Sequence, residues 1–277
     1  MCFELRSPDN EILGIARSVF SRWPAPAGAR LRGQWEIHRN NGRFEIYPEP
    51  VAPPGTTIPD IGTPGQAVTL VEYAAIWRIV EHCQDILCFH SALLAKDGKS
   101  VAIVGPSEAG KSTLSAGLWQ NGWSFLCDDT TLVTGVRASP GPRRVSLREG
   151  SRGLLGEDLW SSIADTAGYQ KTIAGCLFHP SSEYPLEAEV SLSAIVFLKR
   201  NGAPADAEGP TRLIPANAAI ALLPYTNLVR TLSFSEALAP VATLMSEVPA
   251  WDLPRAPLSE MIESVEELAG VAQPAIA

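Results

Sequence analysis

One short segment limits the folds open to this chain more than any other feature: Gly105-Pro106-Ser107-Glu108-Ala109-Gly110-Lys111-Ser112. Just before it, residues 100–104 are mostly apolar and partly β-branched, which predicts a buried strand. Just after it, residues 113–119 predict the first turns of a helix. A glycine-rich loop that joins a buried strand to a helix is the context that distinguishes a phosphate-binding loop from a chance match to its pattern. The sequence therefore predicts a nucleoside triphosphate site in an α/β fold.

The residue types in this loop suit the chemistry of phosphate binding. Gly105 and Gly110 allow backbone angles that arrange successive N–H groups around an anion, and the start of the helix adds positive potential. Lys111 can reach the outer phosphates, and the hydroxyl of Ser112 can ligate Mg²⁺. We therefore expect ATP and Mg²⁺ as cofactors, bound by Gly105, Pro106, Ser107, Glu108, Ala109, Gly110, Lys111, Ser112 and Thr113. The alternative is a glycine turn that opens an ordinary helix.

Two adjacent carboxylates form the second chemical signal. Residues 123–127 predict a strand that ends at Asp128 and Asp129. Phosphoryl transfer needs an acidic group to hold Mg²⁺ and often a second one to accept a hydroxyl proton. The two residues can divide these roles, and the sequence does not say which residue takes which. The alternative is an Asp-Asp turn without a catalytic role.

One histidine and two arginines allow more than one interpretation. His90 lies in the run 86–94, which predicts one strand joined to the strand before the loop by a hairpin turn at 96–99. A histidine in such a strand is either a packed residue or a catalytic one, and the spacing favours neither. We interpret Arg143 and Arg144, in a proline- and glycine-rich loop, as surface charges.

Composition excludes several functional classes. The chain has 277 residues, of which 45% are hydrophobic, and this is enough for a large core. Its net charge of −8 argues against a broad surface for nucleic acids or anionic membranes. The N-terminus lacks the pattern of a secretory signal, and no run approaches the roughly eighteen apolar residues of a membrane helix. We therefore expect a cytoplasmic protein.

Cysteine usage agrees with that location. The cysteines occur at positions 2, 83, 88, 127 and 176, an odd and scattered set that favours reduced thiols over a disulfide framework. Cys83, Cys88 and His90 lie close together in the sequence, but their spacing matches no common zinc motif and no fourth ligand is evident. We expect apolar packing of these two thiols rather than a metal site.

The first part of the chain predicts a small α+β unit. Residues 3–6 alternate like a strand, and residues 11–23 predict a helix. Two alternating segments then flank Asn41-Gly42, which is typical of a type I′ hairpin. Residues 48–66 are rich in proline and glycine and predict a linker. We therefore divide the chain into a small N-terminal domain with its linker, 1–66, and a larger nucleotide-binding domain, 67–277.

The larger domain predicts both helices and strands beyond the loop. We expect a strand at 193–198 that is apolar enough to lie in the centre of a sheet. Further strands are expected at 145–147 and 211–214, and helices at 68–84, 217–223, 233–248 and 258–272. Together with the loop, these elements predict a mixed-sheet α/β core.

Three motifs occur in the order and approximate spacing found in the HPr kinase/phosphorylase group. They are His90-Ser91-Ala92, the loop at 105–113 and Cys127-Asp128-Asp129. The chain resembles the bacterial HPr-kinase-related proteins, and its loop is also similar to that of phosphoenolpyruvate carboxykinases. Residues 143–148 and 169–172 look like two further blocks of those relatives. The resemblance implies a mixed-sheet P-loop kinase core with a small α+β N-terminal domain.

The resemblance also implies an activity: ATP- and Mg²⁺-dependent phosphorylation of a serine-type hydroxyl in a peptide, a protein or a small molecule. Arg148 and Lys171 would be further phosphate or substrate contacts, although each can equally be a solvated charge. Members of the HPr kinase group form hexamers, so the resemblance implies a homo-oligomer as well. The site residues that it implies are Lys111 and Ser112 for phosphates and Mg²⁺, Asp128 and Asp129 for metal binding and the general base, and His90 beside the transferred phosphoryl group.

Departures from the family pattern leave alternatives open. The chain has Thr113 where HPr kinases usually carry a glutamate, and their downstream glycine-rich signature is not recognisable. The carrier protein HPr is therefore not implied as the substrate. One alternative is a nucleotide-binding regulatory protein without kinase activity, and another is a metabolic phosphotransferase that acts on a free amino acid or sugar. In a peptide kinase, we expect the N-terminal unit to help present the substrate.

Overall fold

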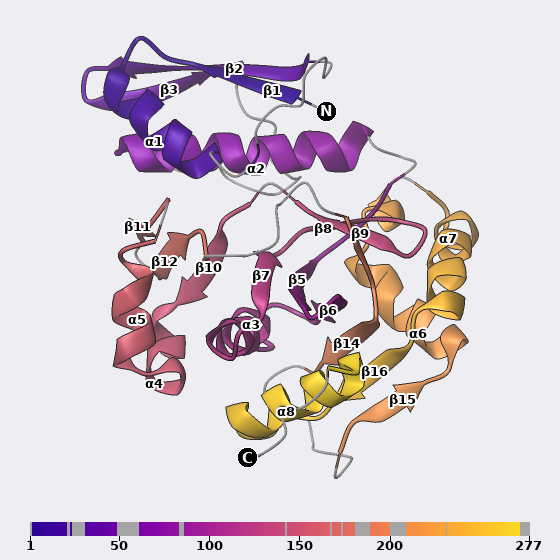
Figure 1. The fold of residues 1–277 in the computed structure, drawn as a ribbon. Helices are drawn as coiled ribbons and strands as arrows, with labels where there is room; N and C mark the ends of the chain where they lie inside the picture. Colours follow the sequence, from indigo (N-terminus) through magenta and orange to yellow (C-terminus); the bar gives the residue numbers. More distant parts are fainter. Residues whose placement is uncertain are drawn as a thin grey trace.

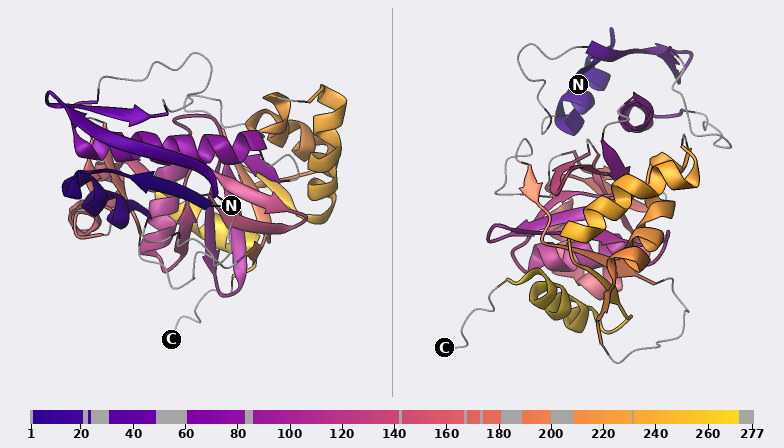
Figure 2. Two further views of the ribbon diagram at one scale, coloured as in Figure 1. Left: turned by 90° about the horizontal axis from the view of Figure 1, so that it is seen from above. Right: turned by 90° about the vertical axis from the view of Figure 1, so that its right-hand side faces the viewer.

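The computed structural model has a mixed α/β fold, so the predicted class is confirmed (Figure 1). The described residues are 2–20, 23, 31–48, 61–82, 86–141, 143–166, 168–172, 174–180, 189–199, 209–230 and 232–271. The right-hand view of Figure 2 shows the N-terminal sheet on one side of a long helix and the remaining sheets on the other. Within these ranges, no helix has the length and apolar character needed to cross a membrane.

The N-terminal unit contains the elements that the sequence predicts. β1 (Cys2–Arg6) is followed by α1 (Asn10–Phe20) and by the hairpin of β2 (Leu31–Asn40) and β3 (Arg43–Tyr47). The sheet order is β1-β2-β3, with β1 parallel to β2. Asn41 and Gly42 have positive φ angles of 49° and 78°, which confirms the predicted type I′ turn. The predicted linker at 48–66 lies mostly outside the described residues, and residues 64–66 belong to the next helix.

That helix, α2 (Pro64–His82), lies between the N-terminal sheet and the rest of the molecule (Figures 1 and 2). One face of α2 packs with α1, β2 and β3 in a shared apolar core, to which it contributes Ala67, Val68, Val71, Ala74 and Ala75. The core of the N-terminal unit therefore extends past residue 66, where we placed the domain boundary. That boundary stays a prediction.

The central sheet has six strands in the order β15-β16-β14-β6-β5-β7. Its bounds are β5 (Ser91–Lys96), β6 (Lys99–Val104), β7 (Ser124–Cys127), β14 (Ala194–Leu198), β15 (Thr211–Leu213) and β16 (Ala250–Leu253). β6, β14 and β16 run parallel, and β5, β7 and β15 are antiparallel to their neighbours. The three parallel strands therefore end at the same edge of the sheet.

Helices cover both faces of the central sheet. On one face lie α3 (Lys111–Gln120) and α8 (Leu258–Ala269), and on the other lie α6 (Pro215–Leu222) and α7 (Phe234–Glu247). Successive strand residues point to opposite faces. In β14, Ile195 and Phe197 pack toward α6 and α7, whereas Val196 and Leu198 pack toward α3 and α8. Burial on both faces explains the continuous apolar run that predicted this strand.

Two smaller sheets lie beside the central one, in the orders β13-β9-β8-β4 and β10-β12-β11. Their strands are β4 (Leu87–Phe89), β8 (Thr131–Thr134), β9 (Arg137–Pro140), β10 (Val145–Arg148), β11 (Gln170–Lys171), β12 (Gly175–Phe178) and β13 (Val190–Ser191). Between β10 and β11 lie the short helices α4 (Arg152–Leu155) and α5 (Glu157–Ile163). Most of these elements are too short to give a periodic signal. Among them, strands were predicted only at 145–147, which is β10, and within the run 86–94, which includes β4.

The predicted single strand at 86–94 is wrong, because the chain changes sheets within it. β4 belongs to the four-stranded sheet and β5 to the central sheet, with His90 between them. β7 and β8 are divided between the same two sheets by residues 128–130. β4 pairs with β8 and β5 with β7, both antiparallel. The two paired segments, 87–96 and 124–134, therefore bend at the same place as they pass from one sheet to the other. This bend places His90 beside Asp129.

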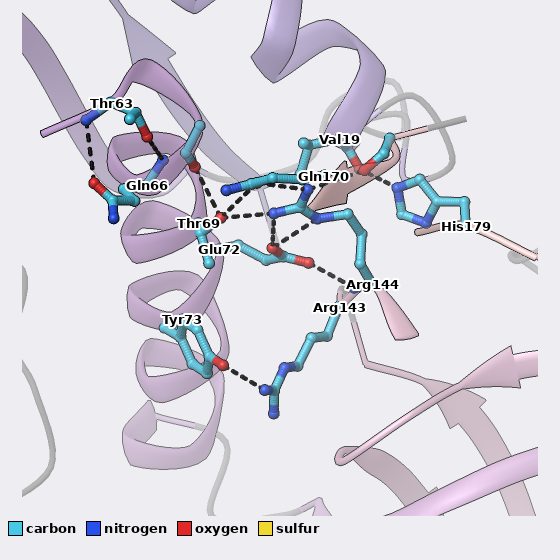
Figure 3. Close-up of polar contacts among 12 residues, drawn as sticks. Val19, Thr63, Gln66, Thr69, Glu72, Tyr73, Arg143, Arg144, Gln170 and His179 are labelled. Atoms are coloured by element: carbon cyan, nitrogen blue, oxygen red, sulfur yellow. Dashed lines mark hydrogen bonds and ion pairs between the residues drawn. The ribbon is translucent and has the colours of Figure 1, made fainter. Parts of the chain in front are cut away.

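A buried ion pair joins α2 to the body of the protein (Figure 3). The side chains of Arg144 and Glu72 are 1% and 2% exposed, and Arg144 Nη2 lies 2.9 Å from Glu72 Oε2. Arg144 also donates hydrogen bonds to Thr69 Oγ1 at 2.7 Å, to the carbonyl oxygen of Gly168 at 3.0 Å and to Gln170 Oε1 at 3.1 Å. The interpretation of Arg144 as a surface charge is therefore wrong.

Loss of Glu72 should destabilise the fold. Glu72→Ala leaves the guanidinium of Arg144 buried without its anion, and breaking a buried pair in this way costs about 3–5 kcal/mol. The control is Glu189, which forms an exposed ion pair with Arg137; the two side chains are 51% and 53% exposed, respectively. Glu189→Ala should therefore cost less than about 1 kcal/mol. Urea unfolding of both variants measures the two differences, and equal losses would contradict a stabilising role for the Glu72 contact.

Candidate active site

The glycine-rich loop connects β6 to α3, as the sequence predicts. A Cβ atom on Gly105 would lie 2.8 Å from the carbonyl oxygen of Leu198, closer than real Cβ atoms approach backbone. Gly110 has a φ of 97°, in the left-handed region that favours glycine. It directly precedes α3, and no side chain caps the helix there. The loop therefore leads into a helix N-terminus whose N–H groups attract anions.

The structure brings the loop and the carboxylate pair together. Ser112 Oγ donates a hydrogen bond of 2.9 Å to Asp128 Oδ2. The N–H of Ser146 donates to the same oxygen at 3.3 Å, and the N–H of Asp129 donates to Asp128 Oδ1 at 3.1 Å. A hydroxyl at the start of α3 and a carboxylate at the end of β7 therefore lie in direct contact.

Asp128 lies in an environment that disfavours its charge. The residue is 1% exposed. Burial raises the pKa of its carboxyl from 3.8 to about 6, the charge of Asp129 also raises it, and Arg143 and the hydrogen bond from Ser112 oppose the rise. The carboxyl is therefore close to the point of half-protonation just below neutral pH.

Asp129 and His90 meet where the two strand pairs bend. Asp129 has a φ of 64°, which is uncommon outside glycine. Its carbonyl oxygen lies 3.1 Å from His90 Nδ1, and its Oδ1 lies 3.5 Å from His90 Nε2. Partial burial lowers the pKa of His90, with Asp129 opposing this effect and Lys111 adding to it. The histidine for which the sequence favoured neither interpretation therefore contacts the carboxylate pair.

Arg143 was interpreted as a surface charge, and the structure corrects this interpretation. Its side chain is 14% exposed and forms an ion pair with Asp129 Oδ2. The Asp129 carboxylate thus contacts Arg143 through one oxygen and His90 through the other. No local pattern indicates this contact, since a proline- and glycine-rich segment has the same composition whether it folds inward or lies at the surface.

Lys111 is also enclosed in the site. It is 6% exposed, and its Nζ donates to the carbonyl oxygens of Gly105 at 2.9 Å and Pro106 at 3.1 Å. Burial lowers the pKa of its ammonium, and the two aspartates oppose this change. An anion in the loop would therefore meet a positive charge that two loop carbonyls hold in place.

A cavity of about 790 Å³ opens over these residues. Its volume is typical of a small-molecule site. The lining includes loop residues 107–113, His90, both aspartates and Arg143, together with Tyr73 of α2. The candidate site residues that lie far apart in the sequence thus share one concave surface.

The same cavity is lined by two cationic residues that the sequence analysis missed. Lys199 follows β14, and Arg255 follows β16. Ligands of α/β sheets bind at the carboxyl ends of parallel strands. Because Lys199 directly follows the predicted strand at 193–198, its position at the site could have been predicted. β16 was not predicted, and no signal indicated Arg255. Apolar residues line this part of the cavity as well: Leu198, Leu253, Pro257, Leu258 and Met261.

The two predicted secondary contacts differ in position. Arg148 lines the cavity and forms an ion pair with Glu108 of the loop, and these side chains are 61% and 62% exposed. Lys171 lies in β11 and does not line the cavity, although its neighbour Thr172 does. The structure therefore brings Arg148, but not Lys171, to the cavity.

The oxygen atoms of Ser112 and Asp128 fit Mg²⁺ in combination with a phosphate ligand, whereas both carboxylate oxygens of Asp129, the third predicted metal ligand, contact His90 and Arg143. Magnesium sites for nucleotides use one or two carboxylates, and phosphate oxygens and water complete the coordination. Among the residues that the structure describes, no group of three or more His, Cys, Asp or Glu side chains is placed to hold a metal ion. A metal here would therefore need oxygens from its ligand. The Cys83, Cys88 and His90 grouping includes Cys83, which lies outside the described residues.

Comparisons with known proteins give weak matches. A family model described as SynChlorMet cassette protein ScmC matches residues 65–143, from α2 to Arg143. This is less than half of the chain and does not assign the chain to that family. The solved structure of the Hpr(Ser) kinase/phosphatase from Coxiella burnetii is 19% identical, covers 65% of this chain and 93% of that chain, and has a TM-score of 0.32. That similarity is too low to establish a shared fold. No curated protein matches the chain.

The raised pKa of Asp128 predicts a pH-dependent stability. Its pKa of about 6 in the folded state lies above the ordinary 3.8, so the folded state binds this proton more tightly. The contribution of Asp128 to stability therefore falls as the pH rises through this window. Above the window, Asp128→Asn removes a buried charge and should stabilise the ligand-free protein by up to about 3 kcal/mol.

Thermal melting of the parent and of Asp128→Asn between about pH 4 and about pH 8 measures this effect. The advantage of the variant should shrink toward zero at the acidic end, where the parent carboxyl is protonated. A variant that is destabilised by the same amount at every pH would contradict the buried charge.

Proposed function

We propose that this protein is an ATP- and Mg²⁺-dependent kinase that phosphorylates a serine-type hydroxyl of a peptide, a protein or a small molecule. One observation carries the proposal: the hydroxyl of Ser112, at the start of the helix after the glycine-rich loop, lies 2.9 Å from the carboxylate of Asp128. Phosphate loops use a helix N-terminus, a hydroxyl and a carboxylate from a neighbouring strand to hold a nucleotide with its metal.

The contacts support a division of roles between the two aspartates. Asp128 shares a hydrogen bond with Ser112, and we assign these two residues to Mg²⁺. Asp129 instead contacts His90 and Arg143, and we assign it as the general base. The sequence left this assignment open, since a one-residue shift in strand register would exchange the two side chains.

The chain's own residues would position the reactants and move one proton. Lys111 and the N–H groups of the loop bind the outer phosphates of ATP. Mg²⁺, when bound, neutralises part of the phosphate charge. Asp129 accepts the proton of the acceptor hydroxyl while the hydroxyl oxygen bonds to the terminal phosphorus, and the bond to the ADP oxygen breaks. His90 lies beside the Asp129 carboxylate and, on this proposal, close to the transferred phosphoryl group.

The second carboxylate favours a kinase over a regulatory protein that only binds nucleotide. Binding a metal–nucleotide complex needs a carboxylate next to Ser112, and Asp128 supplies it. Asp129 instead lies beside His90 in the cavity. A protein that only binds nucleotide does not need a second carboxylate at this position. On this proposal the acceptor enters at the end of the cavity lined by Tyr73, His90 and Asp129, which we name the acceptor end.

Two variants should separate binding from catalysis. Lys111→Ala should weaken both ATP binding and turnover, because it removes a charge from the phosphate site. Asp129→Asn should keep ATP binding and lose about 10²–10⁴ in rate, the usual range for a positioned acid–base group. The matched control is Asp158→Asn, which changes an exposed carboxylate in α5.

Calorimetry measures ATP binding, and a mass-shift screen of peptides and metabolites with ATP and Mg²⁺ identifies the acceptor for rate measurements. A parent protein that does not bind ATP would overturn the proposal. Turnover that is unchanged in Asp129→Asn would remove the general base. Tight ATP binding without any phosphoryl transfer would favour the regulatory alternative.

A further inference from the structure

Arg143 connects the acceptor end of the cavity to the N-terminal unit. Its Nη1 pairs with Asp129 Oδ2, and its Nη2 donates a hydrogen bond of 2.5 Å to the hydroxyl of Tyr73 in α2. The guanidinium carbon also lies 4.4 Å from the centre of the Tyr73 ring. Figure 3 shows the Arg143 side chain reaching the Tyr73 hydroxyl next to the Arg144–Glu72 pair. One side chain thus contacts both the proposed base and a helix of the N-terminal unit.

The neighbouring residues of both segments are paired as well. Glu72 Oε1 accepts a hydrogen bond of 2.5 Å from the N–H of Arg144, and Glu72 Oε2 accepts from Arg144 Nε at 3.1 Å and from Nη2 at 2.9 Å. Two consecutive residues of α2, Glu72 and Tyr73, therefore contact two consecutive residues of the segment before β10. This pairing fixes the point from which the side chain of Arg143 reaches Asp129.

We propose that Arg143 is a positioning residue that holds the Asp129 carboxylate at the acceptor end of the cavity, and that Tyr73 of α2 holds Arg143 in turn. The catalytic consequence rests on the proposed function, whereas the positioning contact can be measured without it. On this view α2 is part of the site, and the N-terminal unit is coupled to the proposed base through two side chains.

The chemistry of these contacts requires arginine. A guanidinium is planar, offers separate N–H groups to two acceptors and can stack on an aromatic ring at the same time. A lysine carries one compact ammonium and cannot reproduce this set of contacts. Without the cation, the like charges of Asp128 and Asp129 repel one another. We therefore expect the Asp129 carboxylate to move away from its position beside His90 when Arg143 is replaced.

A first experiment tests the position of Asp129 without any activity measurement. Both ring nitrogens of His90 contact Asp129, so the ¹⁵N resonances of His90 report where that residue lies. Tyr73→Ala should shift these resonances at constant pH, because it releases Arg143. In an Arg143→Gln background the same substitution should add no further shift, since Tyr73 acts through Arg143. The matched control is Tyr169→Ala, which removes another exposed tyrosine and should leave His90 unchanged.

Two results of this experiment would overturn the proposal. In the first, Tyr73→Ala leaves the resonances of His90 unchanged. In the second, Tyr73→Ala shifts them equally with and without Arg143, so that its effect does not pass through that residue. His90→Gln identifies the resonances in each background.

A second experiment measures turnover of ATP with the acceptor found in the screen. Arg143→Lys should lower kcat about tenfold to a hundredfold, as expected for a small displacement of a catalytic group. The KM for ATP should change less than about threefold. Tyr73→Phe keeps the ring stacked on Arg143 and should retain more activity than Tyr73→Ala. A higher KM for ATP with unchanged kcat would overturn the proposal and make Arg143 a nucleotide contact.

The two experiments separate failure of this inference from failure of the proposed function. If the parent neither binds nor uses ATP but His90 responds as expected, the kinase proposal fails and the positioning contact stands. If phosphoryl transfer is found but the response of His90 to Tyr73→Ala persists without Arg143, the kinase proposal stands and this inference fails.

Discussion

Two antiparallel strand pairs, β4–β8 and β5–β7, bend together from one sheet to the next, and the candidate site depends on this bend. It brings His90 against Asp129, and the hydroxyl of Ser91 donates a hydrogen bond of 2.6 Å to Thr131 Oγ1 across the same junction. β5 also pairs with β6, the strand that leads into the glycine-rich loop. The loop and the carboxylates therefore lie at the ends of strands separated by a single strand, close enough for Ser112 to contact Asp128.

Burial of charge is the energetic cost of this arrangement. Burial raises the pKa of Asp128 and lowers that of Lys111, so the charged form of each group is less favourable here than in water. Neighbours of opposite charge offset part of this cost, as Arg143 does for the aspartates. Charges that are fixed and partly dehydrated act more strongly on a ligand than the same charges in water. A site that stabilises phosphate charge is expected to give up stability in this way.

The sequence predicted those features that local pattern determines. The loop at 105–112 and the turn at Asn41-Gly42 depend on glycine at defined positions, and both lie where they were expected. The bend at His90 was not predictable, because the apolar run contains no glycine, proline, asparagine or aspartate and the change of sheet depends on distant strands. Arg143 and Arg144 were misinterpreted for a related reason, since their acidic partners come from other segments of the chain. The chemical roles of the site residues stay predictions.

The position of α2 changes the meaning of the proposed domain boundary. With 3.6 residues per turn, Val71 and Ala75 lie on one face of this helix and pack in the N-terminal core. Tyr73 lies on the opposite face and Glu72 on the flank between the two faces, and both contact the body of the protein. One helix therefore belongs both to the core of the N-terminal unit and to the wall of the cavity. Any shift of that unit would move Tyr73 and, through Arg143, the carboxylate of Asp129. An acceptor that engages the N-terminal unit would thus act on the same side chains that we propose to carry out the chemistry.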